Sequence, residues 1–200
     1  MTRYLPGILA MAAIVMASNI LVQIPFGTWL TWGAFTYPFA FLVTDVMNRL
    51  HGARAARRIV LAGFVAGVAC SLIAAGLDKT TLRIALASGT AFLVAQMLDV
   101  TIFDRLRHGR WWSAPLASSL AGSAIDTMLF FSIAFAAALP ADVNTGWANE
   151  AAPLLGHGPV TALWVSLATA DWLIKLWLAL LALVPFRMIV RNLLGRRAEI

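Results

Sequence analysis

The sequence predicts an all-α polytopic membrane protein with six transmembrane helices and both termini in the cytoplasm. Three observations lead to this prediction: an apolar composition, six apolar segments of spanning length, and an uneven distribution of arginine. Of the 200 residues, 61% are hydrophobic and 12% are charged, and the mean hydropathy is +0.83. A soluble domain carries about 25% charged residues. Because the length is that of one domain, we predict a single integral membrane domain over 1–200.

The six segments are found by length and apolarity, since a spanning helix needs about 20 mostly apolar residues. They cover residues 5–24, 33–47, 59–77, 82–103, 115–139 and 160–185. The first exceeds the apolar core of a signal peptide, about 7–15 residues, so we expect a retained helix. Trp29, Leu30 and Trp32 extend the second into the outer interface. Gly33 and Pro38 predict a kink or a local break in it.

Lysine and arginine are distributed unevenly between the two predicted sides of the membrane. Twelve lie on one side: Arg3, Arg49, Arg54, Arg57, Arg58, Arg105, Arg107, Arg110, Arg187, Arg191, Arg196 and Arg197. The other side has only Lys79 and Arg83. The positive-inside rule therefore places both termini in the cytoplasm. This topology accounts for the net charge of +6 and the pI near 10.7, so we do not predict nucleic-acid binding.

Five charged residues fall within the predicted spans, where each costs about 2.5–3.5 kcal/mol on insertion scales and marks a candidate functional site. They are Asp45, Asp99, Asp126, Asp171 and Lys175. Asp126 and Asp171 lie at similar depths in spans of opposite direction, roughly 16 Å from the membrane surface. Transporters commonly place their substrate sites at this depth.

The spacing of these charges suggests their partners. Asp171 and Lys175 are four residues apart, so they share a helix face and can form either a structural ion pair or part of a binding site. Asp126 has no such neighbour, and it shares a narrow face with Ser118 and Gly122 that favours close helix approach.

Further polar residues lie nearer the ends of the predicted spans. Asp45 and Asp99 are within reach of Arg49 and Arg105, so they are predicted either as interfacial salt bridges or as a gate. Two pairs of residues share helix faces and can bind a ligand or join helices: Asn19 with Gln23, and Gln96 with Asp99.

Several kinds of chemistry are absent from the sequence. Cys70 is the single cysteine, so neither an intramolecular disulfide nor a thiol cluster can form. His51, His108 and His157 lie in predicted loops without metal-ligand spacing, and there is no phosphate-binding loop or hydrolase motif. We therefore predict neither an enzyme nor a bound metal or cofactor.

Four segments combine apolar runs with the buried charges and the loop arginines: TWGAFTYPFAFLVTDVMNR (31–49), ASGTAFLVAQMLDVTIFDRLR (87–107), RWWSAPLASSLAGSAIDTMLFFSIAF (110–135) and DWLIK (171–175). Together they resemble the queuosine precursor transporter family. The resemblance implies a multi-pass importer of the inner membrane for 7-deazaguanine precursors, such as 7-cyano-7-deazaguanine, that are used to make tRNA queuosine. It also implies a fold shared with the membrane subunits of vitamin importers. The loop at 77–81 is short for the family, so the 140–159 segment is expected to cap the outer mouth instead.

The implied substrate is a flat base with adjacent N–H donors, which a carboxylate can accept while an aromatic ring covers the flat face. Asp126 or Asp171 is the expected acceptor, Lys175 an expected donor, and Phe35, Tyr37 or Trp172 the expected stacking partner. The full set of candidate substrate-binding residues is Asp126, Asp171, Lys175, Asn19, Gln23, Phe35, Tyr37, Gln96, Asp99 and Asp45.

Three functional hypotheses remain open at this point. The first is a standalone secondary transporter, in which a midplane carboxylate either couples import to protons or supports facilitated diffusion; a homo-oligomer is left open. The alternative is a substrate-binding membrane subunit of an ATP-driven vitamin-type importer, with Ala13 and Ala17 forming a docking face on the first span. The third is a structural or assembly protein without a substrate.

Overall fold

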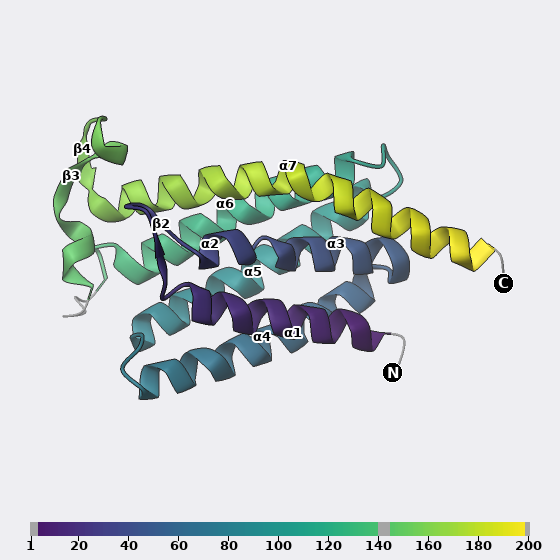
Figure 1. Cartoon of the computed structure of the whole chain (residues 1–200), viewed down its shortest axis with the longest axis horizontal. Coiled ribbons are helices and arrows are strands. Elements are labelled where there is room, and N and C mark those ends of the chain that lie inside the picture. The colour runs from purple at the N-terminus through teal and green to yellow at the C-terminus, as the bar shows by residue number, and fades with distance from the viewer. Residues whose placement is uncertain (1–3, 140–144, 199–200) are drawn as a thin grey trace.

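A computed structural model describes residues 4–139 and 145–198, and in this part the chain folds as a helical bundle. Its helices are α1 (Leu5–Leu21), α2 (Gly33–Thr36), α3 (Phe39–His51), α4 (Ala53–Gly76), α5 (Leu82–Leu106), α6 (Ser113–Phe135) and α7 (Leu163–Ala198). All except the short α2 run along the long axis of the molecule, and α3 lies in the middle of the bundle (Figure 1).

Two short antiparallel hairpins lie together at one end of the bundle (Figure 1). The first pairs β1 (Pro25–Phe26) with β2 (Leu30–Thr31), and the second pairs β3 (Ala151–Pro153) with β4 (Val160–Ala162). The 3-10 helices η2 (Gly146–Asn149) and η3 (Leu154–Gly156) flank β3. The part of the 140–159 segment that the structure describes therefore lies at this end, and residues 140–144 fall outside the described residues.

Within residues 4–139 and 145–198, four helices are long and apolar enough to cross a membrane: α4, α5, α6 and α7. The prediction of a polytopic all-α membrane protein is therefore confirmed at this level. The first predicted span forms α1, which has 17 residues, and the second is divided between α2 and α3. These two segments fall below the usual spanning length of about 20 residues.

The predicted break in the second segment is confirmed at Tyr37 and Pro38, between α2 and α3. Proline has no backbone N–H, so a regular helical hydrogen bond cannot form at this residue. Turn-type bonds replace it: the Ala40 amide donates to the Tyr37 carbonyl, and the Phe41 amide donates to the Pro38 carbonyl. The break places the Tyr37 side chain between two helical segments in the centre of the bundle.

Other helices differ from the predicted ranges at their ends. Helix α4 begins at Ala53, directly after Gly52, whose φ of 82° ends α3 in a conformation that favours glycine. Its first turns carry exposed arginines. A search for apolar segments leaves these residues out, although they are part of the helix. Helix α6 ends at Phe135, and α7 begins at Leu163 and continues through Pro185 to Ala198.

Arginine gathers at the end of the bundle opposite the hairpins, where the α3–α4 and α5–α6 connections and the end of α7 lie (Figure 1). Arg49 and Arg107 each donate from the guanidinium to the other's backbone carbonyl, which joins the two connections. Arg187 of α7 stacks on the Trp111 ring at 4.5 Å. Arg3 lies outside the described residues, as do the side chains of Arg196 and Arg197.

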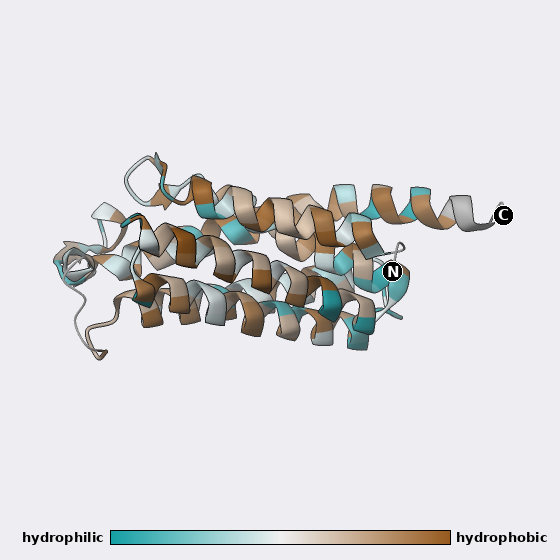
Figure 2. Cartoon of the chain, turned by 90° about the horizontal axis from the view of Figure 1, so that it is seen from below, coloured by the Kyte–Doolittle hydropathy of each residue, from teal (hydrophilic) through white to brown (hydrophobic). Residues whose placement is uncertain are grey.

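The bundle places apolar side chains outside and many polar side chains inside. Val65 and Trp177 are 66% and 65% exposed, and Figure 2 shows hydrophobic residues along the helices with hydrophilic ones gathered towards their ends. Buried polar side chains from α3, α5 and α6 include Thr44, Asn48, Gln96 and Ser118. A surface of this kind suits lipid rather than water, since a soluble protein exposes only small apolar patches.

Small residues let α5 and α6 pack closely. Ala87, Ala91 and Ala95 are buried on α5, and Gly122 of α6 faces this helix. A side chain at Gly122 would lie 2.7 Å from the Phe41 ring and 3.4 Å from the Ala95 carbonyl oxygen. The narrow face predicted around Gly122 is therefore used for packing.

Replacing Gly122 with valine is expected to lower stability by about 1–3 kcal/mol, because the ring and backbone around it leave no room. The thermal unfolding of the purified protein in detergent measures this. Gly76→Val is the matched control, since nothing lies within 4 Å of a side chain placed there. Equal unfolding temperatures for the two variants would contradict the packing described here.

Candidate functional site

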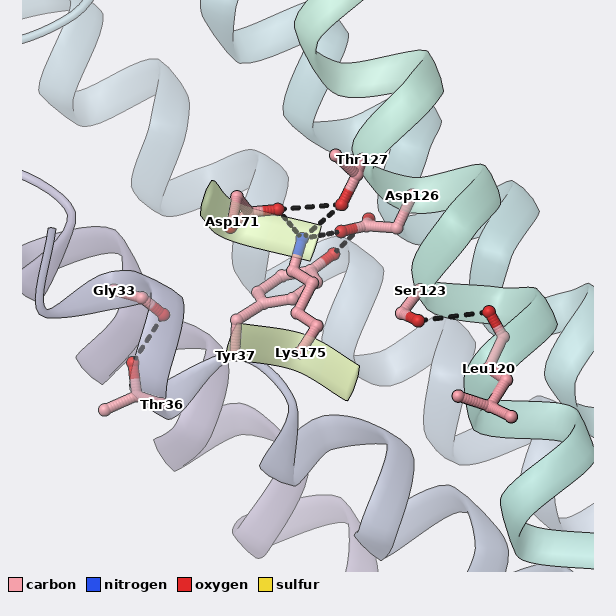
Figure 3. Close-up of polar contacts among 9 residues, drawn as sticks. All are labelled: Gly33, Thr36, Tyr37, Leu120, Ser123, Asp126, Thr127, Asp171 and Lys175. Carbon is pink, nitrogen blue, oxygen red and sulfur yellow. Dashed lines mark hydrogen bonds and ion pairs between the residues drawn. The ribbon is translucent and has the colours of Figure 1, made fainter. Parts of the chain in front are cut away.

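A buried charge cluster joins α6 to α7 (Figure 3). The Lys175 Nζ atom lies 2.7 Å from Asp126 Oδ2 and 2.5 Å from Asp171 Oδ2. It also donates to the Thr127 hydroxyl at 3.2 Å. Lys175 and Asp126 are 5% and 4% exposed, so these groups interact away from solvent.

The predicted pair of Asp171 and Lys175 forms. Asp126 has no charged partner at helical spacing within α6, but Lys175 reaches it from α7. Sequence spacing reveals partners within one helix, whereas this contact depends on how α6 and α7 pack. The similar depth predicted for Asp126 and Asp171 made such a contact feasible.

Tyr37 and Thr127 complete the cluster. The Tyr37 hydroxyl donates to Asp126 Oδ1 at 3.2 Å, and Lys175 Nζ lies 5.5 Å from the centre of the Tyr37 ring. The Thr127 hydroxyl donates to Asp171 Oδ2 at 2.7 Å. Because Tyr37 sits in the break between α2 and α3, the broken helix supplies both an aromatic face and a polar group to the site.

The charges in this cluster do not balance. Two carboxylates surround one ammonium group, so the cluster keeps an excess of hydrogen-bond acceptors when both are ionised. Removing a partner from a buried ion pair is strongly unfavourable, which makes Lys175 necessary to hold Asp126 and Asp171 together. The cluster therefore suits a ligand that brings further N–H donors.

A small cavity extends from this cluster towards the arginine-rich end of the bundle. Lys175 and Ser123 line one part of it, and Ser119 and Asp45 line another. Its volume is about 20 Å³, which holds about one water molecule. The described conformation is closed to a nucleobase-sized ligand, so binding requires the helices around the cavity to move apart.

A second polar cluster lies between α3, α5 and α6. Asp45 accepts hydrogen bonds from the hydroxyls of Ser118 and Ser119 at 3.1 and 3.3 Å. Asp99 is on α5, which the hydrogen bonds from Thr44 to Gln96 and from Asn48 to Val100 join to α3 on either side of Asp45 and Asp99. Within the described part of the chain, neither aspartate forms the ion pair that its spacing to Arg49 or Arg105 allowed. The salt-bridge interpretation of these two residues is therefore not supported.

Gln96 belongs to this second cluster and joins α5 to α3. Its side-chain oxygen accepts a hydrogen bond from Thr44 at 2.6 Å. One turn further along, the Asn48 amide donates to the Val100 carbonyl at 3.0 Å.

The remaining candidates lie elsewhere. Asn19 accepts a hydrogen bond from Ser71 and joins α1 to α4, and Gln23 donates to the Asn19 carbonyl near the end of α1. Phe35 packs edge-on against Phe26 of the first hairpin. Trp172 is 39% exposed and faces outward from α7, so in this conformation it does not cover the cluster. Of the three aromatic candidates, only Tyr37 contacts the charged residues.

Sequence reasoning missed Thr127, Ser123 and Thr44. Threonine and serine are common in membrane helices and carry no insertion penalty comparable to that of a charge, so they did not stand out. Thr127 follows Asp126 directly in the sequence, and this position is the signal that could have identified Thr127 as a site residue.

A bundle of apolar helices, with a broken helix and a charge cluster at its centre, is typical of membrane transporters. Comparison with known sequences agrees. The chain belongs to the family described as "Putative vitamin uptake transporter", which it matches over residues 31–190. Membership of a transporter family confirms the prediction that the protein is not an enzyme.

Curated relatives support the same assignment. The chain is 34% identical to the queuosine precursor transporter of Escherichia coli over 92% of this chain and 84% of the relative. It is 33% identical to a protein of Haemophilus influenzae named as a probable queuosine precursor transporter, over 93% and 85% of the two chains. A Bacillus subtilis protein of the same name is 29% identical over 59% of this chain and 62% of its own length. The resemblance noted in the sequence is thus confirmed, and no solved structure matches significantly.

Replacing Lys175 with methionine is expected to destabilise the protein by about 3–5 kcal/mol, because the buried Asp126 carboxylate and the partly buried Asp171 carboxylate lose their counter-ion. Adding Asp126→Asn and Asp171→Asn to this variant is expected to restore most of the stability, since the uncompensated charges are then gone. Thermal unfolding in detergent measures both effects. Lys79→Met, at an exposed lysine, is the control. A Lys175→Met protein as stable as the wild type would contradict the role given to the cluster.

Proposed function

We propose that this protein imports queuosine precursors, 7-cyano-7-deazaguanine or related 7-deazaguanines, across the inner membrane for tRNA queuosine salvage. The observation that carries the proposal is the cluster of Lys175, Asp126, Asp171 and Tyr37, buried in the centre of an apolar bundle. The names of the curated relatives support the substrate class.

The proposed topology has six membrane passes with both termini in the cytoplasm. Helix α1 and the broken α2–α3 segment supply the first two passes, and α4 to α7 supply the other four. Support comes from the arrangement of the connections: those rich in arginine share one end of the bundle, and the hairpins share the other (Figure 1). By the positive-inside rule the arginine-rich end is cytoplasmic.

The proposed recognition uses the guanine-like edge of the substrate. This edge offers an N–H and an exocyclic amine side by side, and a carboxylate accepts two such donors at once. Asp126 is the proposed acceptor, with the substrate replacing the hydrogen bond from Tyr37. Lys175 then donates to the substrate carbonyl, and the Tyr37 ring covers the base. A base without these donors would leave buried acceptors unpaired and bind poorly.

The first alternative, a binding subunit for an external ATPase, is not favoured, because the curated relatives are named as transporters. A secondary transporter moves substrate by itself, whereas a binding subunit needs its partner. Purified protein in liposomes distinguishes them: uptake without any partner is expected from the secondary transporter.

Uptake of 7-cyano-7-deazaguanine is expected to fall roughly 10- to 100-fold in the Asp126→Asn variant. The reason is the loss of a hydrogen bond to a charged acceptor, worth about 1.5–3 kcal/mol. The measurement is precursor-dependent queuosine formation in cells that can neither make the precursor nor import it by another route.

Asp78→Asn is the matched control for this experiment. Asp78 is exposed in the α4–α5 connection, and its φ of 55° is one that asparagine tolerates well. Full queuosine formation is expected from this variant. If no 7-deazaguanine restores queuosine formation in cells that contain the wild-type protein, the proposed substrate is wrong. If Asp126→Asn restores queuosine formation as well as the wild type does, the proposed site is wrong.

A further inference from the structure

Asp45 and Asp99 form a pair of carboxyl groups that the proposed substrate contacts do not use. Asp45 comes from α3 and Asp99 from α5, and the hydrogen bonds from Thr44 to Gln96 and from Asn48 to Val100 join these helices on either side of the pair, so that the two carboxyl groups interact. They are 2% and 0% exposed. Two carboxylates this close and this deeply buried cannot both remain charged, because repulsion and burial act in the same direction.

The surroundings of the pair lack the donors that two ionised carboxylates need. Ser118 and Ser119 donate to Asp45, one to each oxygen. Ser118 also lies near Asp99, but its hydroxyl donates to Asp45, and among the described residues Asp99 has no hydrogen bond of its own. The Asn48 side-chain oxygen and the Gln96 side-chain nitrogen, from the same two helices, are also buried without partners. A buried polar atom normally has a hydrogen-bond partner, and a proton shared between the two carboxyl groups would give Asp99 one.

The charged groups on the neighbouring elements do not neutralise the pair. On α3 and α5, the Arg49 side chain binds the Arg107 carbonyl, and Asp104 pairs with Arg107. On α7, Lys175 is engaged with the other cluster, where Asp126 of α6 is its partner.

The other cations near this end of the bundle are exposed and so remain in water. Among the described side chains they are Arg54, Arg57 and Arg58 of α4, Arg105 of α5, Arg110 after it, and Arg191 and Arg187 of α7, the last of which stacks on Trp111.

We propose that Asp45 and Asp99 are a proton-binding site that couples proton movement to transport. The two carboxyl groups hold one proton between them, which forms the missing hydrogen bond and leaves the pair with a single negative charge. The proton arrives from the outer side, passes from the pair to water in the adjoining cavity, and leaves to the cytoplasm, so that no other reactant is needed.

The position of the pair fits this role. Asp45 lines the same cavity as Lys175, with Ser119 and Ser123 between them. Opening of this cavity to admit substrate would also bring water to the pair, so that substrate movement and proton exchange depend on the same helix motion. This inference rests on the proposed function, because coupling requires a transported substrate.

Purified protein in liposomes, with 7-cyano-7-deazaguanine as the probe, tests the proposal. In the wild type, uptake is expected to be driven by an acidic exterior and accompanied by proton entry, seen with an internal pH dye. In Asp99→Asn and in Asp45→Asn, gradient-driven uptake and proton entry are expected to be lost, while exchange of internal for external substrate at equal pH is retained. Asp126→Asn is expected to lose both activities, and Asp78→Asn neither.

The outcomes separate this proposal from the proposed function. Substrate exchange without proton movement in the wild type, or uptake driven by a sodium gradient, would overturn the proton site and leave the substrate assignment intact. Proton-coupled uptake that persists in both Asp45→Asn and Asp99→Asn would also overturn it. No exchange of any 7-deazaguanine by the wild type would instead overturn the proposed function.

Infrared spectroscopy reports the protonation of the pair without a transport assay. The wild-type spectrum alone can overturn the proposal, so this test does not depend on whether a variant folds. The wild-type protein is expected to show the C=O band of a buried protonated carboxyl group at neutral pH. Asp99→Asn is expected to lose this band, and Asp78→Asn to keep it. Absence of the band from the wild type would overturn the proposal.

Discussion

The interaction on which this structure depends most is the contact of one ammonium group with two carboxylates between α6 and α7. Without Lys175, the bundle would bury two negative charges in a medium that cannot solvate them. With Lys175, the negative charge is partly compensated, and the carboxylates can still accept further hydrogen bonds. The same contact thus holds two long helices together and leaves a site suited to a ligand rich in N–H donors.

The broken helix at Pro38 gives this site its aromatic component. A continuous helix would continue its backbone hydrogen bonds through Tyr37, whereas the break places this residue at the junction of α2 and α3. Irregular backbone inside a membrane protein is tolerated where protein or a cavity surrounds it. Here Pro38 lines the cavity and the Tyr37 hydroxyl donates to Asp126, so the break faces protein on this side, whereas Phe39, the next residue, is 45% exposed.

Much of this architecture could be predicted from the sequence, because lipid imposes strong constraints on composition. The apolar segments, the break at Pro38 and the pairing of Asp171 with Lys175 each follow from length, backbone chemistry or helical spacing. The contact of Lys175 with Asp126, and that of Asp45 with Asp99, could not be predicted, because each depends on which helices pack together. The spacing of Asp45 to Arg49 was misleading for a physical reason: the arginine is long enough to reach a backbone carbonyl beyond the end of the helix.

The central claim is that the buried cluster recognises the paired N–H donors of a 7-deazaguanine. Its most direct test is the affinity of the purified protein for 7-cyano-7-deazaguanine, compared with the analogue that lacks only the exocyclic amine. The account predicts that the analogue binds at least about 10-fold more weakly, since one hydrogen bond to a charged acceptor is lost. Equal affinity for the two compounds would contradict it.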